Sequence, residues 1–287
     1  MIPPLTPLTH IPIFTEPIRV VLARYWITSA EEFAATARLG NETHADGLAA
    51  MGNQLALSAD SMEQLYNAAI AATPRASEYS ALVDLDVGDG LLLDELPTHS
   101  GLDFAPPAHL PESVFLPHDL PILDQGGQNT CVAFTMAAML QILAADSTRL
   151  SEQFLFWGCK ELDNMTQNPR GTTPQAAIEA LKRFGICLDS EWPYHVSPMP
   201  GNVGQGPPPT QAQAAAVVRR IRSGGSLDST GSAAVCAALA DSQSVLLGLP
   251  IYPFWTYSGQ TRRGGRVRQP LPGERQYGGH GNCSDLP

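Results

Sequence analysis

The pattern of apolar and polar positions divides the chain into stretches of different character. Residues 1–19 are rich in proline and predict an extended segment. Residues 20–73 carry apolar residues at helical spacing and predict a small helical module. Residues 74–109 are rich in Pro, Asp and Gly, which is typical of a linker or of a strap lying across another surface. At about residue 110 the character changes again, and we interpret residues 110–287 as a second domain.

The helical module carries signals for where its helices start and stop. Ser29 and Glu32 have the spacing of a capping box ahead of an apolar face. Ser61 and Gln64 repeat that spacing and predict the start of another helix. Between these pairs, an apolar run that stops at Gly52 predicts a short helix. We interpret this stretch as a small helical bundle that packs against the C-terminal part of the chain.

A nearly continuous apolar run over residues 131–145 predicts a buried helix. Asn129 or Thr130 is a favourable N-cap, which places Cys131 in the first turn. The positive end of the helix dipole favours a thiolate there, and the thiolate is the nucleophilic form of cysteine. Gly126 allows the backbone to turn sharply into the helix.

Two interpretations of Cys131 are open on this local pattern. Most free cysteines are ordinary buried core residues, and Cys131 fits that description. Alternatively, it is a nucleophile beside an oxyanion site. Gln125 lies a short way upstream in a Gly-rich turn, from which its side-chain amide can donate a hydrogen bond to an oxyanion, as can the backbone N–H of Cys131.

A series of motifs over residues 110–280 favours the nucleophile. Leu-Ser-Glu-Gln at 150–153 precedes Gly-Thr-Thr-Pro at 171–174, and Trp-Pro-Tyr stands at 192–194. The order and spacing of these motifs resemble the papain family of cysteine peptidases, and especially its short bacterial members. The family's Gln-Gly-x-Cys-Gly-Ser-Cys-Trp-Ala-Phe fingerprint is matched at Gln125, Gly126, Cys131, Ala133 and Phe134.

The resemblance implies an α+β, papain-like fold of two subdomains, with residues 1–109 as an N-terminal extension. The helical half would cover about 120–200 and the β-rich half about 201–287, with the active site in the cleft between them. Cys131 would be the nucleophile and Gln125 an oxyanion donor. His280, in a Gly-Gly-His motif, would be the general base. The other histidines have no comparable sequence context.

The resemblance also implies a substrate-binding segment, Gly171, Thr172, Thr173 and Pro174, in which backbone groups pair with an extended peptide. This sequence departs from the family at several positions. Gln128 replaces the disulfide cysteine before the nucleophile, and Val132 replaces the Trp after it. We therefore expect three other cysteines to be free structural thiols: Cys159, Cys187 and Cys236.

The residues after His280 do not match the family, which continues with an apolar strand, an orienting Asn and an Asn-Ser-Trp-Gly run. Asn282 is too close in sequence to be that Asn. Gly-Asn-Cys-Ser-Asp-Leu can be encoded so that a one-base shift reads Ala-Ile-Val-Leu-Ile-Tyr, and we hypothesise a frameshift. A Cys–His dyad without its orienting partner works less well, so we expect reduced activity.

Charge and composition restrict the classes of binding partner and cofactor that we expect. The formal net charge is -11, which argues against nucleic acid, because phosphate binding needs a basic face. The N-terminus lacks the pattern of a signal peptide, and no stretch has the length of a membrane span. Five widely spaced cysteines fit neither a disulfide framework nor a zinc site. We expect no metal or organic cofactor, and a monomer in a reducing compartment, cytoplasmic or exported by a non-classical route.

Two functions are compatible with these residues. The first is a cysteine endopeptidase acting on a peptide or protein substrate and made as a latent precursor, with residues 1–20 or 74–109 lying across the cleft as an intramolecular inhibitor. The second is a catalytically weak or inactive pseudo-peptidase that acts as a protein-binding module, which the altered C-terminus favours. Related Cys–His hydrolases and acyltransferases share the geometry and form a third, smaller class.

Overall fold

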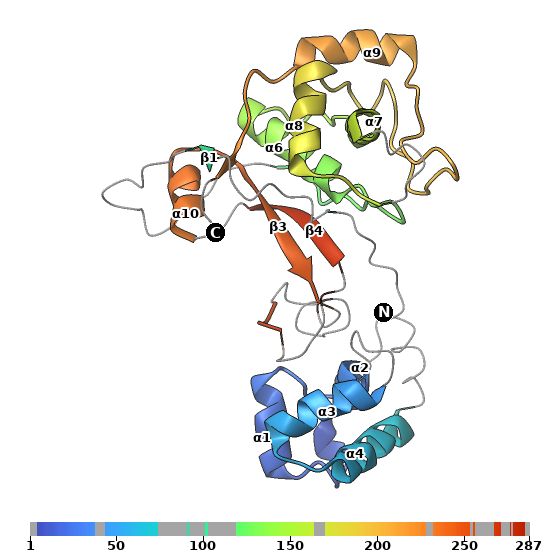
Figure 1. Cartoon of the computed structure of the whole chain (residues 1–287), viewed down its shortest axis with the longest axis vertical. Helices are drawn as coiled ribbons and strands as arrows, with labels where there is room; N and C mark the ends of the chain where they lie inside the picture. The colour runs from blue at the N-terminus through green and yellow to red at the C-terminus, as the bar shows by residue number, and fades with distance from the viewer. Residues whose placement is uncertain are drawn as a thin grey trace. The chain divides into compact units, whose positions relative to one another are not determined.

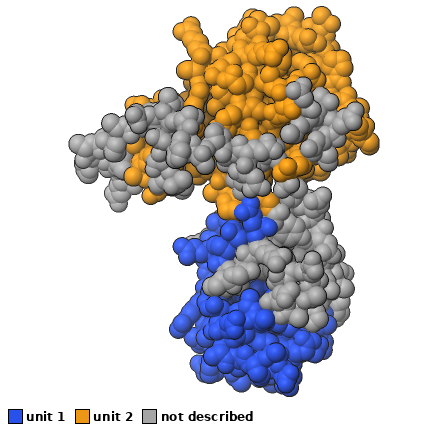
Figure 2. Space-filling view, in the orientation of Figure 1, with its two compact units in different colours: residues 1–87, 251–277 blue, residues 88–250, 278–287 orange. Residues whose placement is uncertain are grey.

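The computed structural model describes two compact units of the chain (Figures 1 and 2). One comprises residues 1–87 and 251–277, and the other comprises residues 88–250 and 278–287. Most of residues 74–118 lie outside the described part, so the predicted boundary near residue 110 stays a prediction. The described residues are 5–37, 44–73, 91, 101–102, 119–163, 170–227, 232–252, 255, 267–270, 276 and 278–284.

The first unit contains a small helical module with its own apolar core. The rings of Phe14 and Phe33 meet edge to face at its centre, with centroids 4.9 Å apart, and both side chains are fully buried. Gly47 lets two helices approach, because an added Cβ would collide with the carbonyl oxygen of Ala37. The elements are η1 (Leu8–His10), α1 (Glu16–Arg24), α2 (Ala30–Ala37), α3 (His44–Leu55) and α4 (Ala59–Ala72).

The helix signals in the sequence have mixed outcomes. The capping box is confirmed: the Glu32 N–H donates to Ser29 Oγ, and the Ser29 N–H donates to the Glu32 carboxylate, both at 3.2 Å. The predicted start at Ser61 is wrong, because Ser58 caps α4 by accepting from the Ser61 N–H at 3.2 Å. The predicted stop at Gly52 is also wrong, since α3 continues to Leu55.

The composition of the Pro-rich beginning of the chain predicts an extended segment. The structure is in part helical there, which corrects that prediction. Helix α1 begins at Glu16, and Pro17 stands in its first turn. Proline is favourable there, because its missing N–H would have no helical partner in any case.

A carboxylate joins the two ends of the helical module. Glu31 is buried and accepts hydrogen bonds from the Thr6 N–H, the Thr6 hydroxyl and the Thr73 hydroxyl, each at 2.9 Å. Residues before the first helix and after the last are therefore held at one point.

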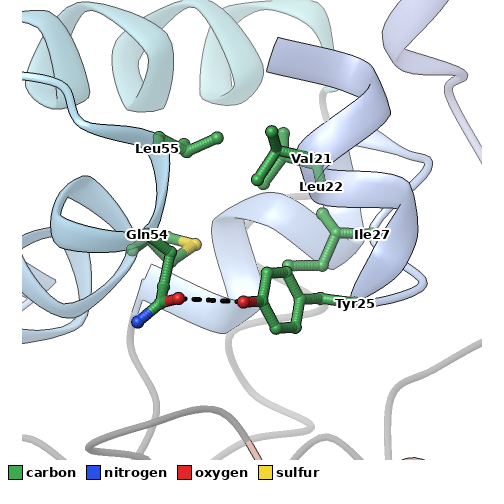
Figure 3. Close-up of a pocket in the computed structure, with 7 residues that line it drawn as sticks. Val21, Leu22, Tyr25, Ile27, Gln54 and Leu55 are labelled. Carbon is green, nitrogen blue, oxygen red and sulfur yellow. Dashed lines mark hydrogen bonds between the residues drawn. The ribbon is translucent and has the colours of Figure 1, made fainter. Parts of the chain in front are cut away.

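The module has a small hollow between α1 and α3, which Figure 3 shows. Its volume is about 10 Å³, and the Tyr25 hydroxyl donates to Gln54 Oε1 across 2.9 Å at its edge. This is room for about one water molecule, so the hollow is a packing defect and not a ligand site.

The second unit is mixed helix and sheet, which confirms the α+β class (Figure 1). Strand β1 pairs in parallel with β2, and β3 pairs with β4. None of the helices in the described ranges is long and apolar enough to cross a membrane. The elements are β1 (Gly101–Leu102), α6 (Cys131–Ala144), α7 (Glu152–Asp163), α8 (Pro174–Arg183), α9 (Thr210–Ala216), η3 (Val217–Arg219), β2 (Ser226–Leu227), α10 (Ser232–Ala240), β3 (Val245–Ile251) and β4 (Gly278–Ser284).

Helices α6, α7 and α8 pack together around one apolar core. The predicted buried helix is confirmed as α6, which begins at Cys131 itself. Its first turns are buried, whereas Leu143 near its end is 52% exposed. The apolar run over residues 245–251 forms strand β3. The core therefore fixes the N-terminus of α6, where the candidate nucleophile lies.

Candidate active site

The candidate nucleophile stands at the first position of α6, and its side chain is 1% exposed. Thr130 is the N-cap residue, as expected, but its side chain makes no capping bond. Its hydroxyl instead shares a 2.8 Å hydrogen bond with the Tyr194 hydroxyl. The start of α6 is therefore tied to the segment after α8 by a side-chain contact.

Burial and backbone donors act on Cys131 in opposite directions. Burial raises the pKa of the Cys131 thiol, while the N–H groups of Gly281, Val132 and Cys131 itself lower it by hydrogen bonding. Burial is the largest effect, so the net shift is upward. The thiolate that the helix dipole was expected to favour is not the stable form in this structure.

Strand β4, which carries the candidate base, lies against the start of α6. The Gly281 N–H donates to Cys131 Sγ at 3.3 Å, and the Gly281 carbonyl accepts from the Thr135 hydroxyl at 3.0 Å. These bonds fix the residue directly after His280 against the first turn of α6. The strand thus carries His280 to the same end of the helix as the thiol.

His280 is half-buried, and its burial lowers the pKa of the imidazole. The neutral form, which can accept a proton, is therefore favoured. Among the described residues, no side chain or backbone group hydrogen-bonds to this imidazole.

The turn before α6 holds Gln125 in a defined place. Gly126 has φ +62°, and an added Cβ would lie 2.7 Å from the Val196 carbonyl oxygen, so glycine is required. Gln125 Nε2 donates to the Gln128 carbonyl at 2.8 Å. Its other amide hydrogen has no partner within the described ranges and is available to a ligand. The Gln125 carbonyl accepts from the Tyr194 hydroxyl at 2.7 Å.

The predicted substrate-binding segment leads into α8, and two of its side chains form hydrogen bonds within the protein. The Thr172 side chain is fully buried and donates to Asp163 Oδ2 at 2.9 Å. Thr173 is the N-cap of α8 and accepts from the Ala176 N–H at 3.2 Å, and Pro174 is the first residue of the helix. The side chains of Thr172 and Thr173 are therefore occupied, which leaves mainly backbone groups for a peptide.

A buried lysine supports this segment, and sequence reasoning missed it. Lys160 on α7 is fully buried, and its Nζ donates to the carbonyls of Arg170 at 2.5 Å and Gly171 at 2.6 Å. Its ammonium also lies 5.4 Å from the centre of the Phe156 ring. The position of this lysine directly after the apolar run over residues 154–159 is the signal that could have identified it.

One residue of the predicted strap lies between the two halves of the candidate site. The Leu91 N–H donates to the Gly279 carbonyl at 3.0 Å, and Leu91 also forms a parallel β-bridge with Thr172. Its side chain is 1% exposed and belongs to the same apolar core as Cys131. Leu91 thus contacts both the strand of His280 and the predicted substrate-binding segment.

Comparisons with known proteins can now be set beside this geometry. No family model and no curated protein matches the sequence. The crystal structure of xylellain, a cysteine protease from Xylella fastidiosa, matches with a TM-score of 0.55 at 22% identity, over 61% of this chain and 69% of that chain. The chain has a papain-like fold. The resemblance drawn from the sequence motifs is confirmed at the level of the fold.

A second solved structure is more distant. It is digestive procathepsin L 3 of the Tenebrio molitor larval midgut, with a TM-score of 0.40 at 14% identity, over 81% of this chain and 74% of that chain. This similarity is too low to carry an argument about the papain-like fold.

Within the papain-like fold, the predicted site residues fall into two groups. Cys131 and the strand of His280 come together directly, through Gly281. Gln125 is held close to the start of α6 by the Tyr194 hydroxyl, which contacts both the Gln125 carbonyl and Thr130. Their catalytic roles remain predictions. No cluster of three potential metal-ligating side chains occurs among the described residues.

Proposed function

We propose that this protein is a cysteine endopeptidase that is made as a latent precursor. The observation that carries the proposal is the 3.3 Å hydrogen bond from the Gly281 N–H to Cys131 Sγ in a papain-like fold. It puts the strand of a neutral histidine against a thiol at a helix N-terminus. A thiol with an imidazole on the adjoining strand can support nucleophilic acyl transfer.

The chemistry would proceed through a thioester. The neutral His280 imidazole takes the Cys131 thiol proton as the sulfur attacks the peptide carbonyl carbon. The oxyanion accepts hydrogen bonds from the Cys131 N–H and from the free amide hydrogen of Gln125. The imidazolium then protonates the leaving amine as the C–N bond breaks. The same imidazole then takes a proton from a water molecule, which attacks the thioester and releases the carboxylic acid as the C–S bond breaks. The imidazolium returns that proton to the Cys131 sulfur, which restores the thiol and the neutral imidazole.

Latency is supported by the position of Leu91. Its N–H occupies the Gly279 carbonyl, and its backbone pairs with Thr172, the place where a substrate strand would pair. Burying a leucine side chain contributes about 1.5–3 kcal/mol, which favours the occupied state. The raised pKa of Cys131 has burial as its main cause, so the same covered state keeps the thiol protonated.

The test is hydrolysis of a fluorogenic peptide amide under reducing conditions, before and after proteolytic trimming near residue 110. Trimming should raise the rate, because it removes Leu91. Cys131→Ala should abolish activity in both forms. Cys236→Ala, which removes a thiol on α10, is the matched control and should retain the activity. Activity that survives Cys131→Ala would refute the proposed nucleophile.

A second candidate function is a pseudo-peptidase that binds a protein partner. It is favoured by the His280 imidazole, which has no hydrogen-bond partner in the described part of the chain, and by the deep burial of Cys131. The same assay separates the two functions. If the trimmed, correctly folded protein shows no thiol-dependent hydrolysis of any peptide, the binding function is preferred.

A further inference from the structure

Two motifs of the sequence, Leu-Ser-Glu-Gln and Trp-Pro-Tyr, have no assigned part in the proposed reaction. The structure joins them. The buried Ser151 hydroxyl donates to the Trp192 carbonyl at 2.6 Å, and the Tyr194 N–H donates to Asp189 Oδ1 at 3.0 Å. The backbone of the Trp-Pro-Tyr segment is therefore fixed by side chains at both of its ends, and the place of the tyrosine is defined.

The Tyr194 hydroxyl reaches the turn that precedes α6 and contacts both of its ends. It donates to the Gln125 carbonyl at 2.7 Å and lies 2.8 Å from the Thr130 hydroxyl. A phenol has one hydrogen to donate, and the Gln125 carbonyl takes it, so the phenolic oxygen accepts from the Thr130 hydroxyl. One side chain thus closes the turn from Gln125 to Thr130.

The ring and the hydroxyl of Tyr194 are held by separate interactions. The ring meets Phe134 of α6 edge to face, with centroids 4.8 Å apart and an interplanar angle of 88°. Burial raises the pKa of the Tyr194 hydroxyl to about 12, so the phenol keeps its hydrogen throughout the neutral pH range. Removal of the hydroxyl alone should therefore leave the ring in place and delete only its two hydrogen bonds.

The peptide group between Gln125 and Gly126 is held on both sides. Its carbonyl accepts from Tyr194, and its N–H, that of Gly126, donates to Asp124 Oδ1 at 2.8 Å. The orientation of this peptide group sets the direction in which the Gln125 side chain leaves the backbone. A donor to an oxyanion is effective when it is in place before the charge develops, because no free energy is then spent on reorganisation.

We propose that Tyr194 is a positioning residue for the oxyanion site, which fixes the backbone of Gln125 so that its side-chain amide faces the carbonyl group that Cys131 attacks. The inference rests on the proposed function and adds to it a residue that acts only through Gln125. An oxyanion forms in the transition state and is absent from the bound substrate. Loss of the positioning should therefore lower kcat and leave KM almost unchanged.

The first experiment compares Tyr194→Phe with the wild type in the full chain, by hydrolysis of a fluorogenic peptide amide under reducing conditions. We expect kcat to fall about tenfold to a hundredfold, with KM changed by less than about twofold. Tyr25→Phe is the matched control, because its hydroxyl donates to Gln54 at 2.9 Å in the first unit, and it should leave both constants unchanged. An unchanged kcat in Tyr194→Phe, or a rise in KM alone, would overturn the proposal.

A double-variant cycle separates positioning from a general structural role. Gln125→Ala should itself lower kcat, and the addition of Tyr194→Phe should then lower it by no more than about twofold, because the group that the tyrosine orients is gone. Circular dichroism checks folding, and rates are divided by the amount of Cys131 that iodoacetamide can alkylate. If Tyr194→Phe reduces kcat by the same factor with and without the Gln125 side chain, the tyrosine acts by another route and the proposal fails.

Amide hydrogen exchange tests the positioning contact without any need for activity. The N–H groups of Gly126, Gly127 and Thr130 are hydrogen-bonded in or beside the turn. Tyr194→Phe should make their exchange about threefold to tenfold faster, since a hydrogen bond that closes the turn is lost, whereas Tyr25→Phe should not. A wild-type chain without thiol-dependent hydrolysis would refute the peptidase, while faster exchange would still support the contact. Unchanged exchange would overturn the positioning role whatever the activity.

Discussion

At the scale of single residues, the two candidate catalytic groups are both held in uncharged forms by burial. Burial raises the pKa of Cys131 and lowers the pKa of His280. A pair in the neutral thiol and imidazole forms is unreactive as it stands but needs only one proton transfer to become the reactive ion pair. The resting chemistry of the site is therefore set by the same burial that the proposed latency requires.

The lowered pKa of His280 predicts a specific loss of stability in mild acid. The unfolded chain takes up a proton near pH 6.5, the ordinary value for histidine, while the folded imidazole resists it. The unfolded state then binds more protons than the folded state. The stability contributed by the neutral imidazole is fully present above about pH 6.5, and the free energy of unfolding falls as the pH drops below that value. His280→Gln should reduce this fall, as measured by urea unfolding at about pH 7.5 and about pH 5.5.

The control for this measurement is His10→Gln, at an exposed position of the first unit. It should leave the acid-induced loss as it is in the wild type. If His280→Gln also leaves that loss unchanged, the His280 imidazole is not a buried neutral group.

At the scale of elements, α7 supports the segment that leads into α8. The connection is the Lys160 ammonium, which reaches the carbonyls of Arg170 and Gly171. A fully buried ammonium is costly unless it is well paired, so the lysine and the two carbonyls depend on one another. The backbone of the predicted substrate-binding segment is thus shaped by a side chain from a neighbouring helix.

Lys160→Met should loosen this segment, because it keeps the length of the side chain and removes its donors. We expect the free energy of unfolding to fall by about 1–3 kcal/mol, since two carbonyls lose their partner while a buried charge is also removed. Amide hydrogen exchange over residues 170–173 should become faster. Lys182→Met, at a partly exposed position paired with Glu179, is the matched control and should change neither quantity. Unaltered exchange in Lys160→Met would show that the segment is shaped by other contacts.

Local signals in the sequence predict helices and caps well. They do not predict contacts between residues that are far apart in the sequence. The capping box at Ser29 and the helix that begins at Cys131 depend on neighbouring residues, and both were found. The start of α4 was misplaced because Ser58 and Ser61 are both good caps, and their choice depends on packing. The pairing of Leu91 with Gly279 joins distant parts of the chain, which no local pattern encodes.

At the scale of the whole molecule, Leu91 anchors the predicted strap in the apolar core of the second unit. Residues 88–250 and 278–287 form that unit, so the predicted strap contributes at least this residue to the core that surrounds Cys131. Access to the site and the integrity of this core are therefore coupled, and a change that releases Leu91 should expose the thiol.

Leu91→Ala should make Cys131 easier to alkylate. Leu→Ala at a buried position costs about 2–5 kcal/mol, and about 1.4 kcal/mol changes an equilibrium tenfold. We expect iodoacetamide to modify Cys131 about tenfold faster or more, as followed by mass spectrometry of the Cys131 peptide. Leu8→Ala is the control, because Leu8 is equally buried but belongs to the first unit. The same alkylation rate in Leu91→Ala and the wild type would argue against a covering role for Leu91.

The hydrogen bonds of Glu31 have a consequence for how this chain could have been assembled. Because Thr6 and Thr73 are bonded to one carboxylate, the chain enters and leaves the helical module at the same place. A module with adjoining ends can be inserted into a host sequence, or excised from it, while the flanking backbone stays almost where it was. The helical module thus has the geometry of a segment that another segment with closely spaced ends could replace at one point of the chain.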